Sequence, residues 1–162
     1  MHVFLEALWI ALPVIVGGAL HITAIRKNVL PALAEIPLDA GMTWRGRRVF
    51  GANKTLRGAL LMIAFTTLSA VLQAWIASRF AWARDLTPPE LTSAGPLVWG
   101  ALLGAGYVIG ELPNSLLKRQ IDIAPGAAGS GALGPAFWII DQVDSLLGAL
   151  VAMSFVWLPP WP

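Results

Sequence analysis

The chain has 162 residues, of which 57% are apolar and only 12% charged, with a formal net charge of +2 and no cysteine. This composition excludes an ordinary soluble domain and is typical of an integral membrane protein. The lack of cysteine excludes disulfides, thiolate nucleophiles and cysteine-bound metals, so carboxylates are the expected ligands of any cation. We therefore expect an all-α helix bundle in the membrane, with residues 1–162 forming one multi-pass domain and with no nucleic acid among its partners.

Four segments are long and apolar enough to cross a bilayer: 3–25, 58–78, 96–112 and 135–158. An even number of crossings places both termini on the same side of the membrane. The first segment has no basic leader, and Glu6 and Pro13 interrupt it, so we expect it to stay in the mature protein rather than to be cleaved as a signal peptide.

The third segment is rich in glycine, with one pair at Gly100 and Gly104 and a second at Gly106 and Gly110. Small residues four positions apart lie on one helix face and let a neighbouring helix approach closely. We expect these glycines to serve packing alone.

Basic residues are concentrated in the stretches 26–57 and 113–134, which hold nine of the eleven: Arg26, Lys27, Arg45, Arg47, Arg48, Lys54, Arg57, Lys118 and Arg119. The positive-inside rule predicts that both stretches face the cytoplasm and that the termini and residues 79–95 face outward. The tryptophans agree with headgroup layers at both ends: Trp9, Trp75, Trp82, Trp99, Trp157 and Trp161 on the outer side, Trp44 and Trp138 on the inner side. We expect a protein of the cell membrane whose site faces the cytoplasm.

The first basic stretch contains "GRRVFGANKTLRG" at 46–58, which runs directly into the second apolar segment. Gly51 would let the backbone approach a ligand, Lys54 and Arg57 supply charge, and Thr55 can cap a helix whose N-terminus favours anions. The pattern indicates a phosphate site. A plain basic flank with a helix cap is an equal alternative, because basic residues belong on the cytoplasmic side in any case.

The second basic stretch contains "GELPNSLLKRQIDIAPG" at 110–126, with an acid, two polar residues and two cations: Glu111, Asn114, Ser115, Lys118 and Arg119. Pro113 is expected to end or kink the helix, so that the following residues run along the membrane surface. Taken alone, Lys118 and Arg119 are better explained as anchors for lipid headgroups, and Asp122 as a solvated loop charge.

The fourth segment contains "FWIIDQVDSLLGAL" at 137–150, which places Asp141 and Asp144 on one helix face. A carboxylate near the centre of a bilayer costs about 2.5–3.5 kcal/mol, so such residues usually serve a function. Two neighbouring carboxylates repel each other unless a cation lies between them, which favours a divalent metal at the membrane boundary. Ion pairs with Lys118 or Arg119, or a proton-relay carboxylate, are the alternatives.

Together, two cationic stretches and a carboxylate pair at one membrane surface suit a nucleoside triphosphate with magnesium, and the second substrate would come from the bilayer. A proton-coupled transporter that uses Asp141 or Asp144, built as a small oligomer, is the runner-up. The excess of cytoplasmic cations argues against it. A homo-oligomer is left open in either case.

Three motifs in this order and spacing, "PLDAGMTWRGRRVFGANKTLRG", "GELPNSLLKRQIDIAPG" and "IDQVDSLLGAL", resemble the CDP-archaeol synthase family over most of the chain. Members of that family are membrane enzymes related to the CDP-diacylglycerol synthases, and they use CTP and magnesium to convert a lipid phosphate to a CDP-activated lipid. The family motifs K-T-x-R, K-R, P-G and D-Q-x-D match, in turn, Lys54, Thr55 and Arg57; Lys118 and Arg119; Pro125 and Gly126; Asp141 and Asp144.

The resemblance implies a CTP-dependent cytidylyltransferase whose lipid phosphate is archaeol-like or phosphatidate-like. Asp141 and Asp144 would hold Mg²⁺, and Lys54 and Lys118 would act with them in catalysis. Lys54, Thr55, Arg57 and Gly51 would bind the triphosphate. Lys118 and Arg119 would bind the lipid phosphate or the leaving pyrophosphate, beside Pro125 and Gly126, with Glu111, Asn114 and Ser115 in support.

Overall fold

The computed structural model describes residues 2–127, 129 and 134–158. Its long helices are α1 (His2–Arg26), α3 (Leu56–Arg79), α6 (Pro96–Gln120) and α7 (Gly134–Met153). Short helices α2 (Pro31–Ala34), α4 (Ala81–Asp85) and α5 (Pro89–Ala94) lie between them. Strands β1 (Thr43–Trp44) and β2 (Arg47–Arg48) form a small antiparallel hairpin, which the sequence did not predict. The all-α helix bundle is confirmed.

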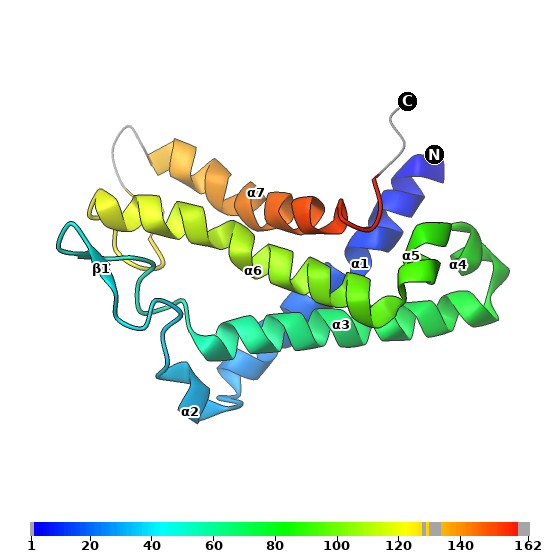
Figure 1. The fold of residues 1–162 in the computed structure, drawn as a ribbon, viewed down its shortest axis with the longest axis horizontal. Helices are drawn as coiled ribbons and strands as arrows, with labels where there is room; N and C mark the ends of the chain where they lie inside the picture. The colour runs from blue at the N-terminus through cyan, green and yellow to red at the C-terminus, as the bar shows by residue number, and fades with distance from the viewer. Residues whose placement is uncertain (1, 128, 130–133, 159–162) are drawn as a thin grey trace.

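The long helices pack in chain order, α1 on α3, α3 on α6 and α6 on α7, each antiparallel to its neighbour (Figure 1). As a result, α2, the hairpin and the start of α7 lie at one end of the bundle, and α4 and α5 lie at the other (Figure 1). The two basic stretches of the sequence therefore meet at the same end.

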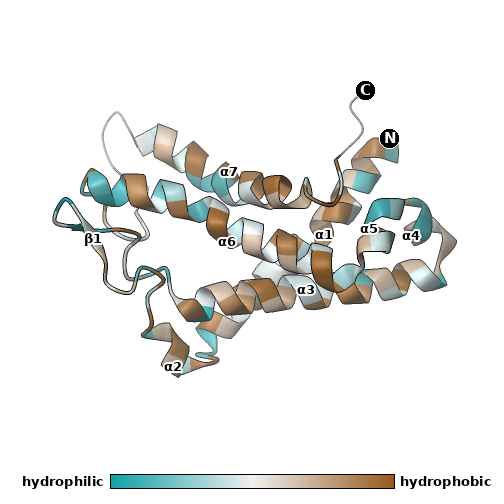
Figure 2. Ribbon diagram, viewed as in Figure 1, coloured by the Kyte–Doolittle hydropathy of each residue, from teal (hydrophilic) through white to brown (hydrophobic). Residues whose placement is uncertain are grey.

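Helices α1, α3 and α7 are each long and apolar enough to cross a membrane. Large apolar side chains are exposed along the bundle, including Leu68, Ile109, Ile139 and Val151. Apolar residues recur along all the long helices (Figure 2). Such a surface is typical of a chain whose solvent is lipid. The crossing by α6, which would be the fourth, stays a prediction.

Glycines bring α6 close to both of its neighbours. A Cβ atom at Gly104 would lie 2.7 Å from the Cα atom of Ile63 on α3, and one at Gly106 would lie 2.5 Å from the Cβ atom of Ala152 on α7. Gly100 and Gly110 make equally close approaches on the same two faces. The predicted packing role of these glycines is confirmed.

Pro113 does not end the third helix, contrary to one of the two expectations, because α6 continues through it to Gln120. A proline removes one backbone donor, but neighbouring helices can support such a helix in a membrane. The continuation changes the position of Lys118 and Arg119, which are 8% and 9% exposed instead of lying along the membrane surface. The last long helix ends at Met153, earlier than expected.

Tryptophans lie at both ends of the bundle. Trp9, Trp82 and Trp99 lie near α4 and α5, where the rings of Trp9 and Trp82 meet edge to face at 5.3 Å. Trp138 lies at the start of α7, at the opposite end. Trp82 and Trp138 are exposed and agree with two headgroup layers, whereas Trp9 and Trp99 are only 8% and 3% exposed and pack inside the bundle. Trp161 lies outside the described residues.

Candidate active site

The loop between α1 and α3 is organised around a buried carboxylate, Asp39, which sequence reasoning missed. Asp39 is 0% exposed and accepts hydrogen bonds from the guanidinium of Arg48 at 2.5 and 3.2 Å and from the N–H groups of Gly41, Phe50 and Gly51 at 3.0–3.3 Å. Burial alone would raise the pKa of Asp39, but these donors hold it well below the usual range for a carboxyl. The Asp-Ala-Gly tripeptide, typical of a turn closed by an Asp side chain, was the available signal.

The end of this loop leads into α3 through a second fixed contact. The N–H of Leu38 donates to the carbonyl of Lys54 at 2.8 Å. The next residue, Thr55, is the N-cap of α3, and its hydroxyl accepts from the N–H of Gly58 at 3.2 Å. The predicted cap is confirmed, and it fixes where the side chain of Lys54 leaves the backbone.

The two basic stretches are tied to each other at the surface. The guanidinium of Arg47 on β2 donates to the carboxylate of Asp122 and to the carbonyl of Gln120, both at 2.5 Å. Asp122 is 71% exposed but is paired, so it is more than the solvated charge expected from the sequence. The hairpin is thereby placed over the C-terminal end of α6.

The two aspartates of α7 face α6 and are joined by one side chain. The amide nitrogen of Asn114 donates to Asp141 and to Asp144, at 2.7 Å each. The amine of Lys118 lies 2.6 Å from both oxygens of Asp141 and donates also to the carbonyl of Ala127 at 2.9 Å. Asn114 and Lys118 occupy the place of the cation that two neighbouring carboxylates require.

Ser145 connects these aspartates to the first basic stretch. Its hydroxyl lies 3.0 Å from a carboxylate oxygen of Glu111 and 3.0 Å from one of Asp144. Glu111 in turn forms an ion pair with Lys54. One continuous polar network therefore runs from Lys54, at the start of α3, to Lys118, near the end of α6.

Arg119 lies behind this network, under the loop. Its guanidinium donates to the carbonyl of Ile123 and lies against Gly51, where a Cβ atom would come within 2.8 Å of the arginine and 3.4 Å of Pro125. Gly51 also has a φ of 99°, so its backbone conformation favours glycine there. Gly126 has a φ of 79°, which favours glycine for the same conformational reason.

The network lines a cavity of about 200 Å³. Nine of the thirteen residues predicted for the site line it: Lys54, Glu111, Asn114, Ser115, Lys118, Arg119, Gly126, Asp141 and Asp144. Thr55 and Arg57 line a second cavity of about 450 Å³ on the other side of the Lys54–Glu111 pair. Gly51 and Pro125 lie beside Arg119. The structure thus brings all three motifs together.

The second cavity also contains His21 of α1, which sequence reasoning missed. Its Nε2 atom is buried and has no hydrogen-bond partner among the described residues. The signal was a lone histidine in an apolar segment, which often has a function in a membrane protein.

An apolar groove reaches the site from the membrane side. It lies between α6 and α7, has a volume of about 510 Å³, and ends at Asn114 and Asp144. Its walls include Ile109, Leu117 and Leu147, which are exposed on the lipid-facing surface. A molecule from the bilayer could therefore approach the aspartates without crossing the loops.

The structure decides between some of the alternatives left open by the sequence. Lys118 and Arg119 are not headgroup anchors, because both are buried and Lys118 is paired with Asp141. That ion pair is the one weighed above as an alternative to a metal. Within the described ranges, no group of three or more His, Cys, Asp or Glu side chains is placed to hold a metal ion.

The donor atoms of the site nevertheless fit a hard cation. Asp141 and Asp144 supply carboxylate oxygens on one helix face, and the amide oxygen of Asn114 is buried with no hydrogen-bond partner in the described chain. Carboxylate and amide oxygens are the ligands that Mg²⁺ accepts, usually with phosphate oxygens and water completing the shell.

Comparisons with known proteins agree with this arrangement. A family model described as CarS-like, CDP-archaeol synthase, matches residues 1–160. The CDP-archaeol synthase of Pyrococcus furiosus is 33% identical over 153 residues, covering 93% of this chain and 75% of that protein. That of Thermococcus onnurineus is 37% identical over 116 residues, covering 70% and 58% respectively.

A solved structure, described as an intramembrane enzyme for archaeal membrane lipids biosynthesis, is similar with a TM-score of 0.60 and 26% identity. The similarity covers 96% of this chain and 82% of that one. It therefore includes most of α6 and α7, the helices that carry most of the network. The chain therefore belongs to the CDP-archaeol synthase family, and it is a membrane cytidylyltransferase of lipid biosynthesis.

Proposed function

We propose that residues 1–162 act as one domain that transfers the cytidylyl group of CTP to a membrane lipid phosphate, giving a CDP-activated lipid and pyrophosphate. The observation that carries this proposal is the polar network joining Lys54, Glu111, Asn114, Asp144 and Asp141 in one cavity at the end of an apolar groove. The names of the relatives favour an archaeol-type phosphate as the lipid substrate.

The reaction requires one bond to form and one to break. An oxygen of the lipid phosphate attacks the α-phosphorus of CTP, and the bond from that phosphorus to the β-phosphate oxygen breaks, so pyrophosphate leaves. A phosphate monoester is already an anion at neutral pH, so the site needs no general base. Its task is to position two anions and to stabilise the charge of the transition state.

The positions of the four cations suit different phosphate groups. Lys54 lies between the two cavities and Arg57 in the larger one, where the N-terminus of α3 also favours anions, so both suit the triphosphate. Lys118 and Arg119 lie on the other side of the smaller cavity, near α7, and suit the lipid phosphate or the leaving pyrophosphate.

Asp141 and Asp144 are the residues that would hold Mg²⁺, and Asn114 would join them once its amide is turned so that the oxygen replaces the nitrogen that now faces both carboxylates. The bound ion would supply Lewis-acid stabilisation of the charge on phosphate. The amine of Lys118, which now neutralises Asp141, would then be available to a phosphate.

The groove between α6 and α7 would hold the hydrocarbon part of the lipid. Its apolar walls end at Asn114 and Asp144, so a lipid lying in it presents its phosphate to the carboxylates. The membership of an enzyme family decides against the transporter considered above.

We further propose that the site end of the bundle faces the cytoplasm, where CTP is found, and that the protein lies in the cell membrane. Nine of eleven basic residues belong to the two stretches at that end. The native chain has no cysteine, so single cysteines report sidedness cleanly. A cysteine that replaces the exposed Arg45 should be labelled only after the cells are opened. If it were labelled from outside intact cells, the true orientation would be the opposite of the one proposed.

The enzymatic proposal is tested by incubating the purified protein with CTP labelled in the cytosine ring, Mg²⁺ and a panel of lipid phosphates. Label should enter the organic phase with an archaeol-type phosphate and less with phosphatidate. If no lipid phosphate carries label into that phase, the proposed reaction is wrong. If phosphatidate is preferred, the reaction stands and the choice of lipid is wrong.

A further inference from the structure

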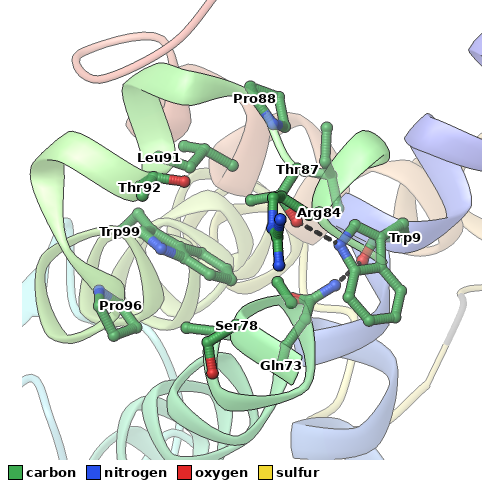
Figure 3. A pocket seen from close by; sticks show the side chains of 13 residues that line it. Trp9, Gln73, Ser78, Arg84, Thr87, Pro88, Leu91, Thr92, Pro96 and Trp99 are labelled. Carbon is green, nitrogen blue, oxygen red and sulfur yellow. Dashed lines mark hydrogen bonds between the residues drawn. The ribbon is translucent and has the colours of Figure 1, made fainter. Parts of the chain in front are cut away.

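A separate cavity lies at the end of the bundle opposite the candidate active site. It has a volume of about 240 Å³ and is enclosed by α1, the second half of α3, α4, α5 and the start of α6 (Figure 3). Arg84 and the rings of Trp9 and Trp99 contribute to its wall. None of the residues assigned to cytidylyl transfer lines it.

The wall of this cavity contains an unused hydrogen-bond acceptor. Gln73 on α3 is 5% exposed, and its amide nitrogen donates to the carbonyl of Trp9 at 2.5 Å. Its amide oxygen is buried with no hydrogen-bond partner among the described residues. An unpaired buried acceptor is unfavourable by about 1–3 kcal/mol, so a donor from a bound molecule is expected here.

The same cavity carries one positive charge. Arg84 on α4 extends into it between Trp9 and Trp99 (Figure 3). In the part of the chain that the structure describes, no acid forms an ion pair with Arg84. Trp9 is itself fixed, because its indole N–H donates to the hydroxyl of Thr87 at 2.9 Å. The cavity therefore presents a cation and an acceptor on a rigid aromatic wall.

The position and size of the cavity point to a lipid headgroup. It lies near the end of α3 at Arg79, and the exposed Trp82 packs edge to face on Trp9 of its wall. Tryptophans and basic residues at helix ends are typical of the headgroup layer. Its volume of about 240 Å³ corresponds to about eight water molecules at their liquid volume of roughly 30 Å³ each. That is too small for a whole lipid but sufficient for a headgroup whose chains lie against the apolar exterior.

We propose that this cavity binds the headgroup of an anionic phospholipid that also carries hydroxyl groups, of the phosphatidylglycerol kind. The phosphate would contact Arg84, and a headgroup hydroxyl would donate to the amide oxygen of Gln73. Because the cavity lies at the other end of the bundle, this lipid is distinct from the substrate, and the inference does not depend on the proposed function.

The test is native mass spectrometry of the purified protein with an equimolar mixture of phosphatidylglycerol and phosphatidylcholine, without CTP. The protein should retain one phosphatidylglycerol in preference to phosphatidylcholine. Arg84→Gln should weaken that binding about tenfold, as expected for the loss of a charge-assisted contact. The matched control is Arg79→Gln, since Arg79 lies at the same end, 5.9 Å from the ring of Trp75, but does not line the cavity.

A second variant fills the cavity instead of changing its charge. Thr92 lines the mouth and is exposed, so Thr92→Trp should fold and should abolish the retained lipid. Equal retention of the two lipids, equal losses in Arg84→Gln and Arg79→Gln, or full retention in Thr92→Trp would each overturn the proposal.

The role of the headgroup hydroxyl has its own comparison. Phosphatidylmethanol has the same charge as phosphatidylglycerol but no hydroxyl, so it should bind several-fold more weakly to the wild-type protein. In Gln73→Leu the ratio between the two lipids should fall to about one, whatever the variant does to stability. A ratio unchanged by Gln73→Leu would show that Gln73 does not receive the hydroxyl.

Discussion

Two carboxylate sites at the same end of the bundle use the same kind of ion pair for different purposes. Asp39 in the loop is 0% exposed, and its two oxygens are occupied by Arg48 and three backbone N–H groups. Asp141 on α7 is paired with Lys118, but its side chain is 30% exposed and faces a cavity that residues of the other two motifs also line.

The two sites differ in whether the carboxylate oxygens remain accessible to a ligand. Asp39 has no accessible oxygen left, so its pairing completes the loop and serves the fold. Asp141 and Asp144 face a cavity and are held by a cation and an amide, so under the proposed function their pairing would keep a site ready for a metal and the phosphates that it binds. Whether an ion pair serves the fold or a binding site is thus better judged from the accessibility of its carboxylate oxygens than from the distance between its two charges.

The largest effect is expected at the accessible site. Asp144→Asn removes one ligand charge without stranding a lysine, because Lys118 pairs with Asp141. We expect a loss of turnover of about a thousand-fold, or about 4 kcal/mol of transition-state stabilisation, at an unchanged melting temperature. The measurement is CDP-lipid formation together with thermal unfolding in detergent.

Asp85→Asn, at the opposite end of the bundle, is the matched control and should keep full activity. Asp141→Asn should be equally inactive but less stable, because it leaves Lys118, whose side chain is 10% exposed, without its partner. If well-folded Asp144→Asn kept near wild-type turnover, Asp144 would be structural like Asp39, and the proposed difference between the two sites would be wrong.

At the closed site, the expected loss is in stability. Asp39→Asn removes the charge that Arg48 and the backbone donors require. Removing one partner of a buried pair destabilises by about 3–5 kcal/mol, and we expect about 3 because the Arg48 side chain is 37% exposed. Hydrogen exchange should show faster exchange at the N–H groups of Phe50 and Gly51. Unchanged protection there would show that Asp39 does not organise the loop.

The two sites explain which parts of the structure could be predicted. The long helices followed from apolar runs of the right length, and the grouping of Lys54, Glu111, Asn114, Lys118 and Asp141 followed from motifs whose chemistry requires one another. Asp39 was missed because its partners come from turns whose geometry depends on the folded loop. The exact end of α6 was missed because a proline can remain inside a helix that neighbouring helices support, and the local sequence does not show such packing.

A third prediction concerns the connection between the two sites. Lys54 follows the loop that Asp39 organises and pairs with Glu111 of the network. Lys54→Ala should weaken CTP binding by about 1.5–3 kcal/mol through loss of a charge-assisted contact. Isothermal titration with CTP measures this, and Lys27→Ala, an exposed lysine of the same loop, should bind normally. If the two variants bound CTP with equal affinity, the loop would be only a basic flank of the membrane helix and not a triphosphate site.

The smallest expected effect is that of acid on the loop. The pKa of Asp39 is held below its usual range, so the stability it contributes is fully present above the unfolded value of about 3.9 and is lost only as pH falls through the lower folded value. Protection of the Gly51 N–H should therefore persist, after correction for intrinsic exchange, from pH 7 to about pH 3, below the ordinary Asp value of about 3.9. Loss of half the protection near about pH 4 would mean that Asp39 titrates normally.

Cytidylyl transfer is tested most directly by following the two ends of CTP separately. Wild-type protein and folded Asp144→Asn are incubated with Mg²⁺, an archaeol-type phosphate and CTP labelled with phosphorus-32 at either the α or the γ position. We expect α label to enter the lipid phase with the wild-type protein and γ label to stay in water as pyrophosphate, while Asp144→Asn transfers almost none. Entry of γ label into the lipid, or unimpaired transfer by Asp144→Asn, would contradict the proposed reaction.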